Sequence, residues 1–245
     1  RRDEIPRTKR EKEKRNNHHN EVLDVSRMEK LNRVLTSRRG NSNHSFGIPS
    51  VIACGNKFLG VGTDRGIVLL FNYFGELHVV LESSAEGTSS PVTSLAFSVS
   101  EESFQVVVSG HRNGHVVLWD TTTGTELKRL LHSECAIRSI RFYRVEEISI
   151  VLCDIKGKVT TLTFSKLLFY WSVSEALLFK ERGEVFAMDT LLTTTKKKST
   201  KTEVRARSLG LVSLILENIT VILSLERLYR GTNDYSLFKL ANPDE

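Results

Sequence analysis

Residues 109–120 read SGHRNGHVVLWD, and this stretch decides the fold. A strand of small residues leads into Asn113-Gly114, and an apolar strand follows that ends at Trp119-Asp120. Asn-Gly is the strongest short-range hairpin signal, because a two-residue turn that matches the twist of its strands needs positive φ, which Gly adopts without penalty. Trp119-Asp120 stands where WD-type repeats carry their named dipeptide. The stretch therefore predicts the two middle strands of a propeller blade.

The same pattern occurs twice more, at residues 61–72 (VGTDRGIVLLFN) and 152–163 (LCDIKGKVTTLT). The turn glycines of the three copies are 48 and 43 residues apart, close to the roughly 40–45-residue period of four-stranded blades. Only the middle copy ends in Trp-Asp, so the repeats are degenerate. The positions predicted to be structural are the hairpin residues Gly66, Asn113, Gly114 and Gly157 and the dipeptide Trp119-Asp120.

Outward from these turns, the sequence predicts an all-β fold, a WD-type β-propeller of about four blades. Turn signals at short intervals also fit an open β-sandwich, but repetition of a four-strand unit favours the propeller. We expect a flexible loop at 193–203 and a tail at 231–245. The predicted blades are 48–81, 92–131, 137–180 and 184–230. The predicted strands are 48–54, 58–63, 67–72 and 77–81; 92–97, 105–110, 115–120 and 126–131; 137–142, 148–154, 158–164 and one near 177–180; and 184–191, 209–216 and 219–225.

The number of predicted blades indicates whether the propeller is whole. Propellers close with roughly four to eight blades, and WD-type ones usually with about seven. The last predicted blade is incomplete. We therefore expect these blades to be part of a seven-bladed propeller and the chain to be a fragment or a truncated gene product.

Residues 1–46 form a charged leader. Residues 1–40 hold thirteen Lys/Arg and seven Asp/Glu, which accounts for the whole formal charge of +6, and the rest of the chain has net charge zero. Residues 1–20 are almost wholly polar and are expected to be disordered. In residues 21–39 apolar side chains recur at helical spacing, which predicts a short amphipathic helix. Its narrow stripe, which lacks aromatic residues, favours packing on the body or a weak helix over a membrane surface.

The neutral body argues against a broad nucleic-acid-binding face, which needs clustered positive charge. The most apolar stretch, 209–225, is broken by Glu217-Asn218 and is shorter than the roughly 20 residues that span a bilayer. It is better explained as two strands around a turn.

The sequence also lacks the motifs of an enzyme. No phosphate-binding glycine loop and no Gly-x-Ser-x-Gly elbow is present. Ser109 and His111 are interpreted as structural, with His111 and Asp120 as candidates for a polar network inside the blade. The cysteines Cys54, Cys135 and Cys153 are far apart and lie in or beside apolar runs, which indicates buried free thiols rather than disulfides or zinc ligands. We therefore expect no enzyme, no cofactor, no catalytic residue and no metal site.

Ten short motifs, in order, resemble the vacuolar protein sorting-associated protein 8 (Vps8) family, the subunit that defines the CORVET endosomal tether. The likeness covers roughly residues 47–225, and the order of the motifs makes it fairly specific. The motifs are GIPSVIA (47–53), VGTDRGIVLLF (61–71), VTSL (92–95), SG (109–110), GHVVLWD (114–120), TTG (122–124), IRF (140–142), LCD (152–154) with KG (156–157), LF (178–179) and RGEV (182–185).

The resemblance implies a function in membrane tethering. In that family an N-terminal propeller precedes an α-solenoid and a RING-type zinc module, and the complex binds a Rab-type GTPase and promotes SNARE-driven fusion. It implies a cytoplasmic protein, peripheral to endosomal membranes, whose partners are other tethering-complex subunits and a Rab-type GTPase. It assigns no residue as a Rab contact. The other hypotheses are an unrelated WD-repeat adaptor in a ubiquitin or nuclear assembly, and nucleic-acid binding through the basic leader.

Overall fold

The computed structural model describes residues 28–37, 45–83, 90–98, 105–144, 148–180, 185–195, 207–216, 219–224 and 237–241. These residues form a helix, α2 (Glu29–Thr36), and four antiparallel sheets. The first two sheets are β1 (Pro49–Cys54), β2 (Leu59–Thr63), β3 (Val68–Phe71) and β4 (Leu77–Leu81), then β5 (Val92–Phe97), β6 (Val106–His111), β7 (His115–Asp120) and β8 (Glu126–Leu131). The last two are β9 (Ile137–Phe142), β10 (Ile148–Asp154), β11 (Lys158–Leu167) and β12 (Tyr170–Lys180), then β13 (Val185–Thr195), β14 (Arg207–Leu216), β15 (Ile219–Ser224) and β16 (Leu237–Ala241).

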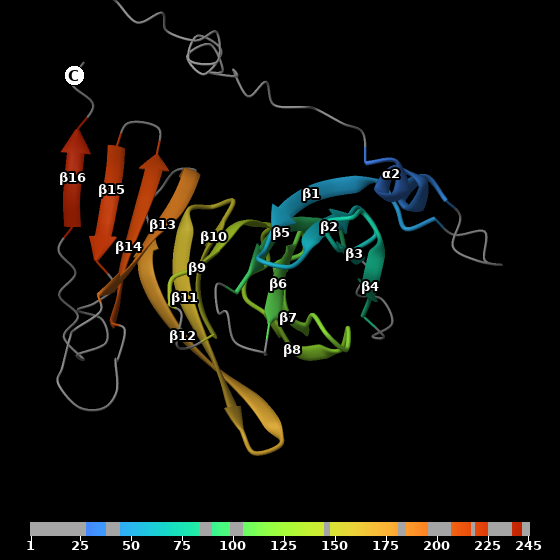
Figure 1. The fold of residues 1–245 in the computed structure, drawn as a ribbon. Helices are drawn as coiled ribbons and strands as arrows, with labels where there is room; N and C mark the ends of the chain where they lie inside the picture. The colour runs from blue at the N-terminus through green and yellow to red at the C-terminus, as the bar shows by residue number, and fades with distance from the viewer. Residues whose placement is uncertain are drawn as a thin grey trace, which may run out of the picture.

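Each sheet is one blade. The strands of every sheet pair in chain order, and the first strands of successive sheets lie next to one another: β1 beside β5, β5 beside β9, and β9 beside β13. Figure 1 shows the four sheets following one another from β1–β4 to β13–β16. The described part of the chain is therefore a partial β-propeller, as the sequence predicted.

The blades hold together through the two faces of their strands. Successive side chains of a strand point to opposite faces, and both faces of β3 are buried. Val68 and Leu70 join a core with Trp119 between the first and second blades, whereas Leu69 and Phe71 belong to a separate cluster on the other face. Similar cores lie between the second and third blades and between the third and fourth. This double burial explains why the middle strands are almost continuously apolar.

Hydroxyl groups on the innermost strands tie neighbouring blades. The Ser50 hydroxyl on β1 donates to the Val92 carbonyl at 2.6 Å, and the Thr93 hydroxyl on β5 donates to the Ile137 carbonyl at 2.6 Å. The two bonds repeat one geometry from blade to blade. The Thr190 hydroxyl on β13 makes a related bond to the Phe142 carbonyl at 3.0 Å.

Helix α2 covers the face of the first blade that points away from the second. Its Leu31, Val34 and Leu35 pack against the cluster that contains Leu69 and Phe71. Lys30 Nζ also lies 2.7 Å from Glu76 Oε1. In the structure, residues 29–36 of the expected helix are helical and pack on the body. Residues 21–27 and 38–39 of the predicted helix, and the predicted disorder of 1–20, lie outside the described residues.

The predicted strands of the first two blades agree with the structure to within a residue or so. The third blade differs, because β11 and β12 continue through residues 165–176, where no strand was expected. The fourth blade differs too: its fourth strand, β16, lies inside the expected tail 231–245, and residues 193–195 of the expected loop belong to β13. The expected incomplete blade therefore has four strands. Residues 196–203 of the loop lie outside the described residues.

Candidate functional site

The three repeated turns have one geometry. Gly66, Gly114 and Gly157 have φ of +79°, +83° and +80°. Each glycine N–H donates to the carbonyl three residues earlier, and in the first blade Thr63 N–H also donates to the Ile67 carbonyl at 2.9 Å. The loop therefore has three residues and ends in a left-handed glycine. The predicted two-residue turn is wrong in this respect: Asn113 does not have positive φ, and its side-chain oxygen accepts the His115 N–H at 3.3 Å.

Trp119 belongs to a buried polar network. Its Nε1–H donates to Ser109 Oγ at 2.9 Å, and Ser109 Oγ lies 3.0 Å from His111 Nε2. His111 Nδ1 lies 3.0 Å from the Ser90 carbonyl, which can only accept, so Nδ1 carries the proton and Nε2 accepts from Ser109. The network ties β6 and β7 to the segment that precedes β5, and every polar atom in it has a partner.

Asp120 is outside this network, contrary to the suggested pairing with His111. Its carboxylate accepts the backbone N–H groups of Thr122 and Thr123 at 2.7 and 3.2 Å, which stabilises the turn after β7. Ser109 and His111 lie on one face of β6, two residues apart, as strand periodicity requires. Both are buried, and the serine hydroxyl is shared between the histidine and Trp119, so the pair is structural rather than a nucleophile and base.

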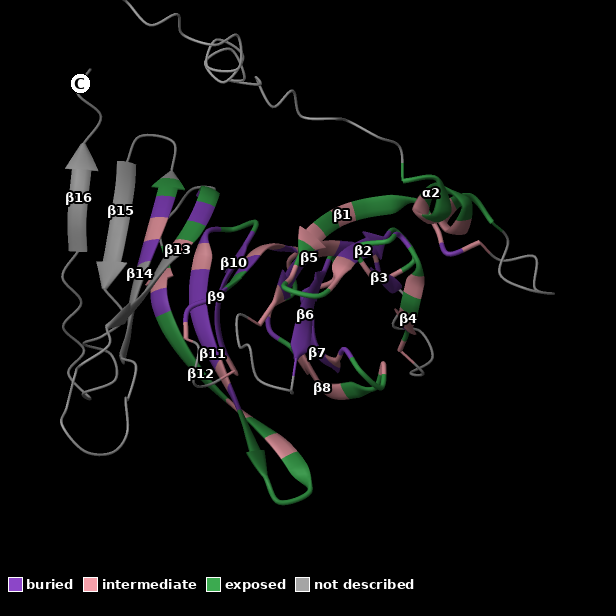
Figure 2. Ribbon diagram, in the orientation of Figure 1, coloured by how far each residue is buried: buried purple, intermediate pink, exposed green. Residues whose placement is uncertain are grey.

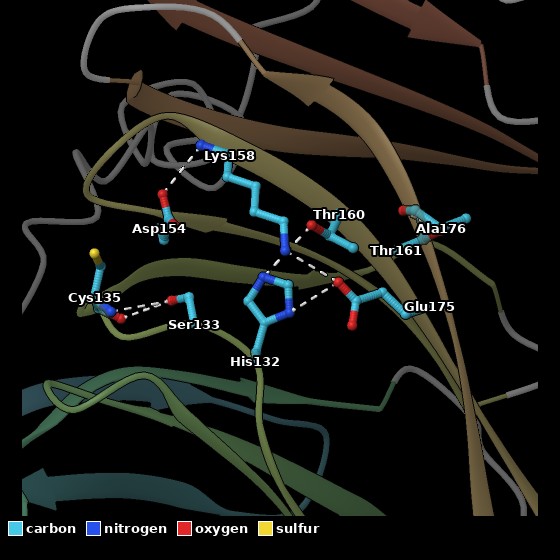
Figure 3. Close-up of polar contacts among 9 residues, drawn as sticks. All are labelled: His132, Ser133, Cys135, Asp154, Lys158, Thr160, Thr161, Glu175 and Ala176. Carbon is cyan, nitrogen blue, oxygen red and sulfur yellow. Dashed lines mark hydrogen bonds and ion pairs between the residues drawn. The ribbon is translucent and has the colours of Figure 1, made fainter.

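A second histidine lies at the base of the β11–β12 hairpin (Figure 3). His132 Nδ1 is 3.4 Å from Glu175 Oε1, and Lys158 Nζ is 3.2 Å from the same oxygen. His132 Nε2 is 3.5 Å from Thr160 Oγ1, and its backbone N–H donates to the Gly114 carbonyl at 3.1 Å. Burial and the Lys158 charge lower the pKa of His132, although Glu175 opposes the shift. The imidazole is therefore neutral and connects the turn of the second blade with two strands of the third.

We expect stability to fall as the pH is lowered from 7 to 5.5. Burial also lowers the pKa of His111 from its usual 6.5, so both histidines bind fewer protons folded than unfolded. Each can lower the free energy of unfolding by at most about 1 kcal/mol between pH 6.5 and 5.5, the limit for an imidazole that stays neutral in the folded state. Urea unfolding at each pH measures this loss. Replacing both by glutamine should flatten the profile; a wild-type midpoint that stays constant or rises on acidification would contradict the expectation.

A pocket of about 260 Å³ lies between β9 and β13. Arg138 and Arg141 line it together with apolar side chains of β13, and Arg141 Nε is 3.6 Å from Asp189 Oδ1. Burial raises the pKa of the Cys153 thiol in its wall to about 12, so the sulfur is protonated and a poor nucleophile. Among the residues that the structure describes, no group of three His, Cys, Asp or Glu side chains could hold a metal ion.

All three cysteines are free thiols. Cys153 is buried as expected, Cys135 is half-buried and Cys54 is exposed, so the expectation of burial is wrong for Cys54. No helix of the described ranges is long and apolar enough to cross a membrane. The stretch 209–225, predicted as two strands around a turn, contains the paired strands β14 and β15.

The main exposed apolar feature was not predicted. We call residues 167–170, at the end of β11 and β12, the hairpin tip. The sequence there is Leu-Leu-Phe-Tyr, and the exposed fractions are 53, 79, 99 and 57%. Figure 2 shows the far end of this hairpin largely in the colour of exposed residues, whereas the middle strands β6 and β7 are buried. Apolar side chains so fully exposed at the end of a projecting hairpin indicate a contact surface.

Comparison with known proteins gives a family and a fold. A family model described as Vps8 beta-propeller matches residues 21–231. No curated protein matches the chain. Among solved structures, the computationally designed protein Ika8 has 17% identity and a TM-score of 0.51 over 76% of this chain, which spans 46% of Ika8. At this identity the likeness concerns the fold alone.

Two further solved structures are similar at lower scores. The Myceliophteria thermophila Cps50 (Swd1) beta-propeller domain has 13% identity and a TM-score of 0.49, with 81% of this chain and 73% of that one covered. The designed protein Ika4 has 17% identity and a TM-score of 0.46, with 80% and 92% covered.

Proposed function

The chain belongs to the Vps8 β-propeller family, and from this membership we propose that it is a protein-interaction scaffold of a CORVET-like endosomal tethering complex. In this function it contributes to vesicle docking and fusion and to protein transport from endosomes to the vacuole or lysosome. Its partners are other subunits of the complex and a Rab-type GTPase. It acts on the cytoplasmic side, peripheral to endosomal membranes.

The family match carries this proposal, because it covers α2 and all four blades up to β15. The chemistry of the described residues supports a scaffold. In the second blade the buried polar side chains of Trp119, Ser109 and His111 bind one another and the Ser90 carbonyl. The exposed part of the molecule instead presents apolar side chains such as the hairpin tip. Such an arrangement fits docking rather than turnover of a small substrate.

A pull-down with the tagged chain tests the function. We expect it to recover large propeller–solenoid subunits of a tethering complex and to retain a purified endosomal Rab-type GTPase in its GTP form more than in its GDP form. Gly114→Ala, which should destabilise the second blade, is the control for specific recovery. Recovery of ubiquitin-ligase or chromatin subunits in place of tethering subunits would favour the alternative, an unrelated WD-repeat adaptor.

A further inference from the structure

The β11–β12 hairpin extends beyond the blade to which it belongs. β11 has 10 residues and β12 has 11, whereas the corresponding strands of the first two blades have 4 to 6. Pairing continues without a break from Phe164–Val173 to Leu167–Tyr170 at the end. Figure 1 shows this end projecting away from the other sheets. The hairpin tip is therefore held out on a regular two-stranded arm.

Side chains along the arm are arranged in layers. The tip is apolar, with Phe169 99% exposed. The next pair is Lys166 opposite Trp171, and the pair after that is Ser165 opposite Ser172. Lys166 is the one charged residue between 163 and 174. Apolar residues at the end, an aromatic and a cation behind them and hydroxyls behind those follow the polarity gradient of a bilayer interface, where Trp and Tyr collect at the headgroups.

The dimensions of the tip agree with this gradient. The Leu167–Tyr170 pair and then the turn residues 168–169 lie beyond the Lys166–Trp171 pair. Strands rise about 3.3 Å per residue, so these two steps carry the tip about 7 Å beyond the lysine. Interfacial apolar groups enter a membrane to a depth of about 5–10 Å. A lysine at that level lies among the headgroups, where it attracts anionic lipids. The nearest acidic residue along the arm, Glu175, is paired with Lys158 at 3.2 Å.

The backbone of the tip also has a feature that folding does not explain. Leu168 has a φ of +52°, the one positive value among the described non-glycine residues. A two-residue turn normally has glycine or asparagine where φ is positive, because a Cβ there is unfavourable. An exposed leucine at this position serves neither the turn nor the core. Backbone strain of this kind is common at functional sites.

A protein groove fits the tip less well than a lipid surface. Neighbouring residues of a hairpin point to opposite faces, and all four residues of the tip are more than half exposed. A groove covers one face of a strand pair and leaves the other in water. A bilayer surrounds the tip on every side and removes all four side chains from water.

We propose that the hairpin tip, residues 167–170, inserts into the interfacial layer of an anionic lipid bilayer, with Lys166 at the headgroups. This contact is direct, whereas the proposed scaffold function requires association with membranes only through partners. The two ideas can therefore fail independently, because purified lipid contains no partner and a pull-down contains no vesicle.

Vesicle flotation tests the contact. The probe is vesicles of about three parts phosphatidylcholine to one part phosphatidylserine, which supply the anionic surface, and the protein is the whole chain. Replacing Leu168 and Phe169 together by serine should lower the bound fraction at least tenfold, because burying a single large apolar side chain is worth about that factor or more. Phe74→Ser is the matched control: Phe74 is 80% exposed in the turn after β3, and its loss should leave binding unchanged.

Fluorescence locates the contact. Both tryptophan probes are made with Trp171 replaced by phenylalanine, because Trp171 lies on the same arm. In that background, Phe169→Trp should shift the emission to the blue when vesicles are added and should be quenched by brominated lipid, whereas Phe74→Trp should show neither change. Leu168→Gly separates binding from folding: it removes the strained leucine, so the melting temperature should not fall, yet vesicle binding should decrease severalfold.

Four results would overturn the proposal. The first is a wild-type chain that does not float with vesicles, and the second is a double serine variant that floats as well as the wild type. The third is binding that is lost in about 1 M salt, where charges are screened beyond about 3 Å, and that is the same for the wild type and the tip variants. That result would assign vesicle binding to the basic leader. A tip that binds a protein subunit in the pull-down but not vesicles would likewise replace the lipid surface by a protein partner.

Discussion

Gly114→Ala should lower the free energy of unfolding by at least about 3 kcal/mol, because buried overlap with backbone atoms cannot be relieved locally. A Cβ built on Gly114 would lie 1.7 Å from the Ser133 carbonyl oxygen and 2.6 Å from its carbon. These atoms belong to the connection that leads to the third blade, where His132 N–H donates to the Gly114 carbonyl. Alanine would also be strained at a φ of +83°. The second turn and the connection to the third blade must separate.

Urea unfolding measures the loss, and Gly75→Ala is its control. Gly75 has nearly the same conformation, with φ of +74°, but a Cβ there would meet first the flexible end of Met28 at 3.3 Å. That substitution should cost only about 1 kcal/mol, the price of the left-handed conformation alone. If the two variants lost equal stability, the close approach of Ser133 would not be important, and the turn geometry would explain both.

The turn glycines also show how much of the fold a sequence repeat can predict. The 48- and 43-residue spacing of the glycines and the apolar strands after them were enough to place the blades. Positive φ is a local requirement, so it is visible in the turn itself. The second reason for glycine, the close approach of another backbone segment, was not predictable, because that segment lies about twenty residues further along the chain. A Cβ on Gly66 would lie 2.7 Å from the Ser90 carbonyl, so the first blade repeats the same close approach.

The polar network could have been predicted more fully than it was. Strand alternation places Ser109 and His111 on one face, and Trp119 two pairs away on the neighbouring strand can reach them. The Trp-Asp dipeptide drew attention to Asp120, which instead stabilises its own turn. The choice of partner for His111, Ser109 or Asp120, depends on the directions of side chains on neighbouring strands.

The hairpin tip was missed for a different reason. Strand prediction depends on burial patterns and on turn residues, and residues 165–176 provide neither. Their side chains are mostly exposed, and the turn itself contains Leu168 and Phe169 instead of glycine or asparagine. β16 was missed because its five residues, Leu-Phe-Lys-Leu-Ala, stand between polar segments and are too few for a clear strand signal. Places where local preference fails are often functional, which agrees with the contact proposed for the tip.

Trp119→Ala should lower the free energy of unfolding by about 3–5 kcal/mol, the range for removing a large buried aromatic side chain. Trp119 has no exposed surface and lies in the core that joins the first and second blades, beside Val68 and Leu70. Its loss leaves a cavity between the two sheets and removes the Nε1–H bond to Ser109. Thermal and urea unfolding should show the same decrease in stability.

Trp119→Phe separates packing from hydrogen bonding. The ring that remains fills most of the space, and Ser109 can still donate to His111, so about 1–2 kcal/mol should be lost. In a double-mutant cycle with Ser109→Ala, the two losses should fall short of additivity by about 1 kcal/mol, because each single change already breaks the bond between them. Full additivity would mean that the Trp119–Ser109 bond adds nothing to stability. Trp119 would then join the blades by apolar packing alone, as its counterpart Leu162 does between the second and third blades.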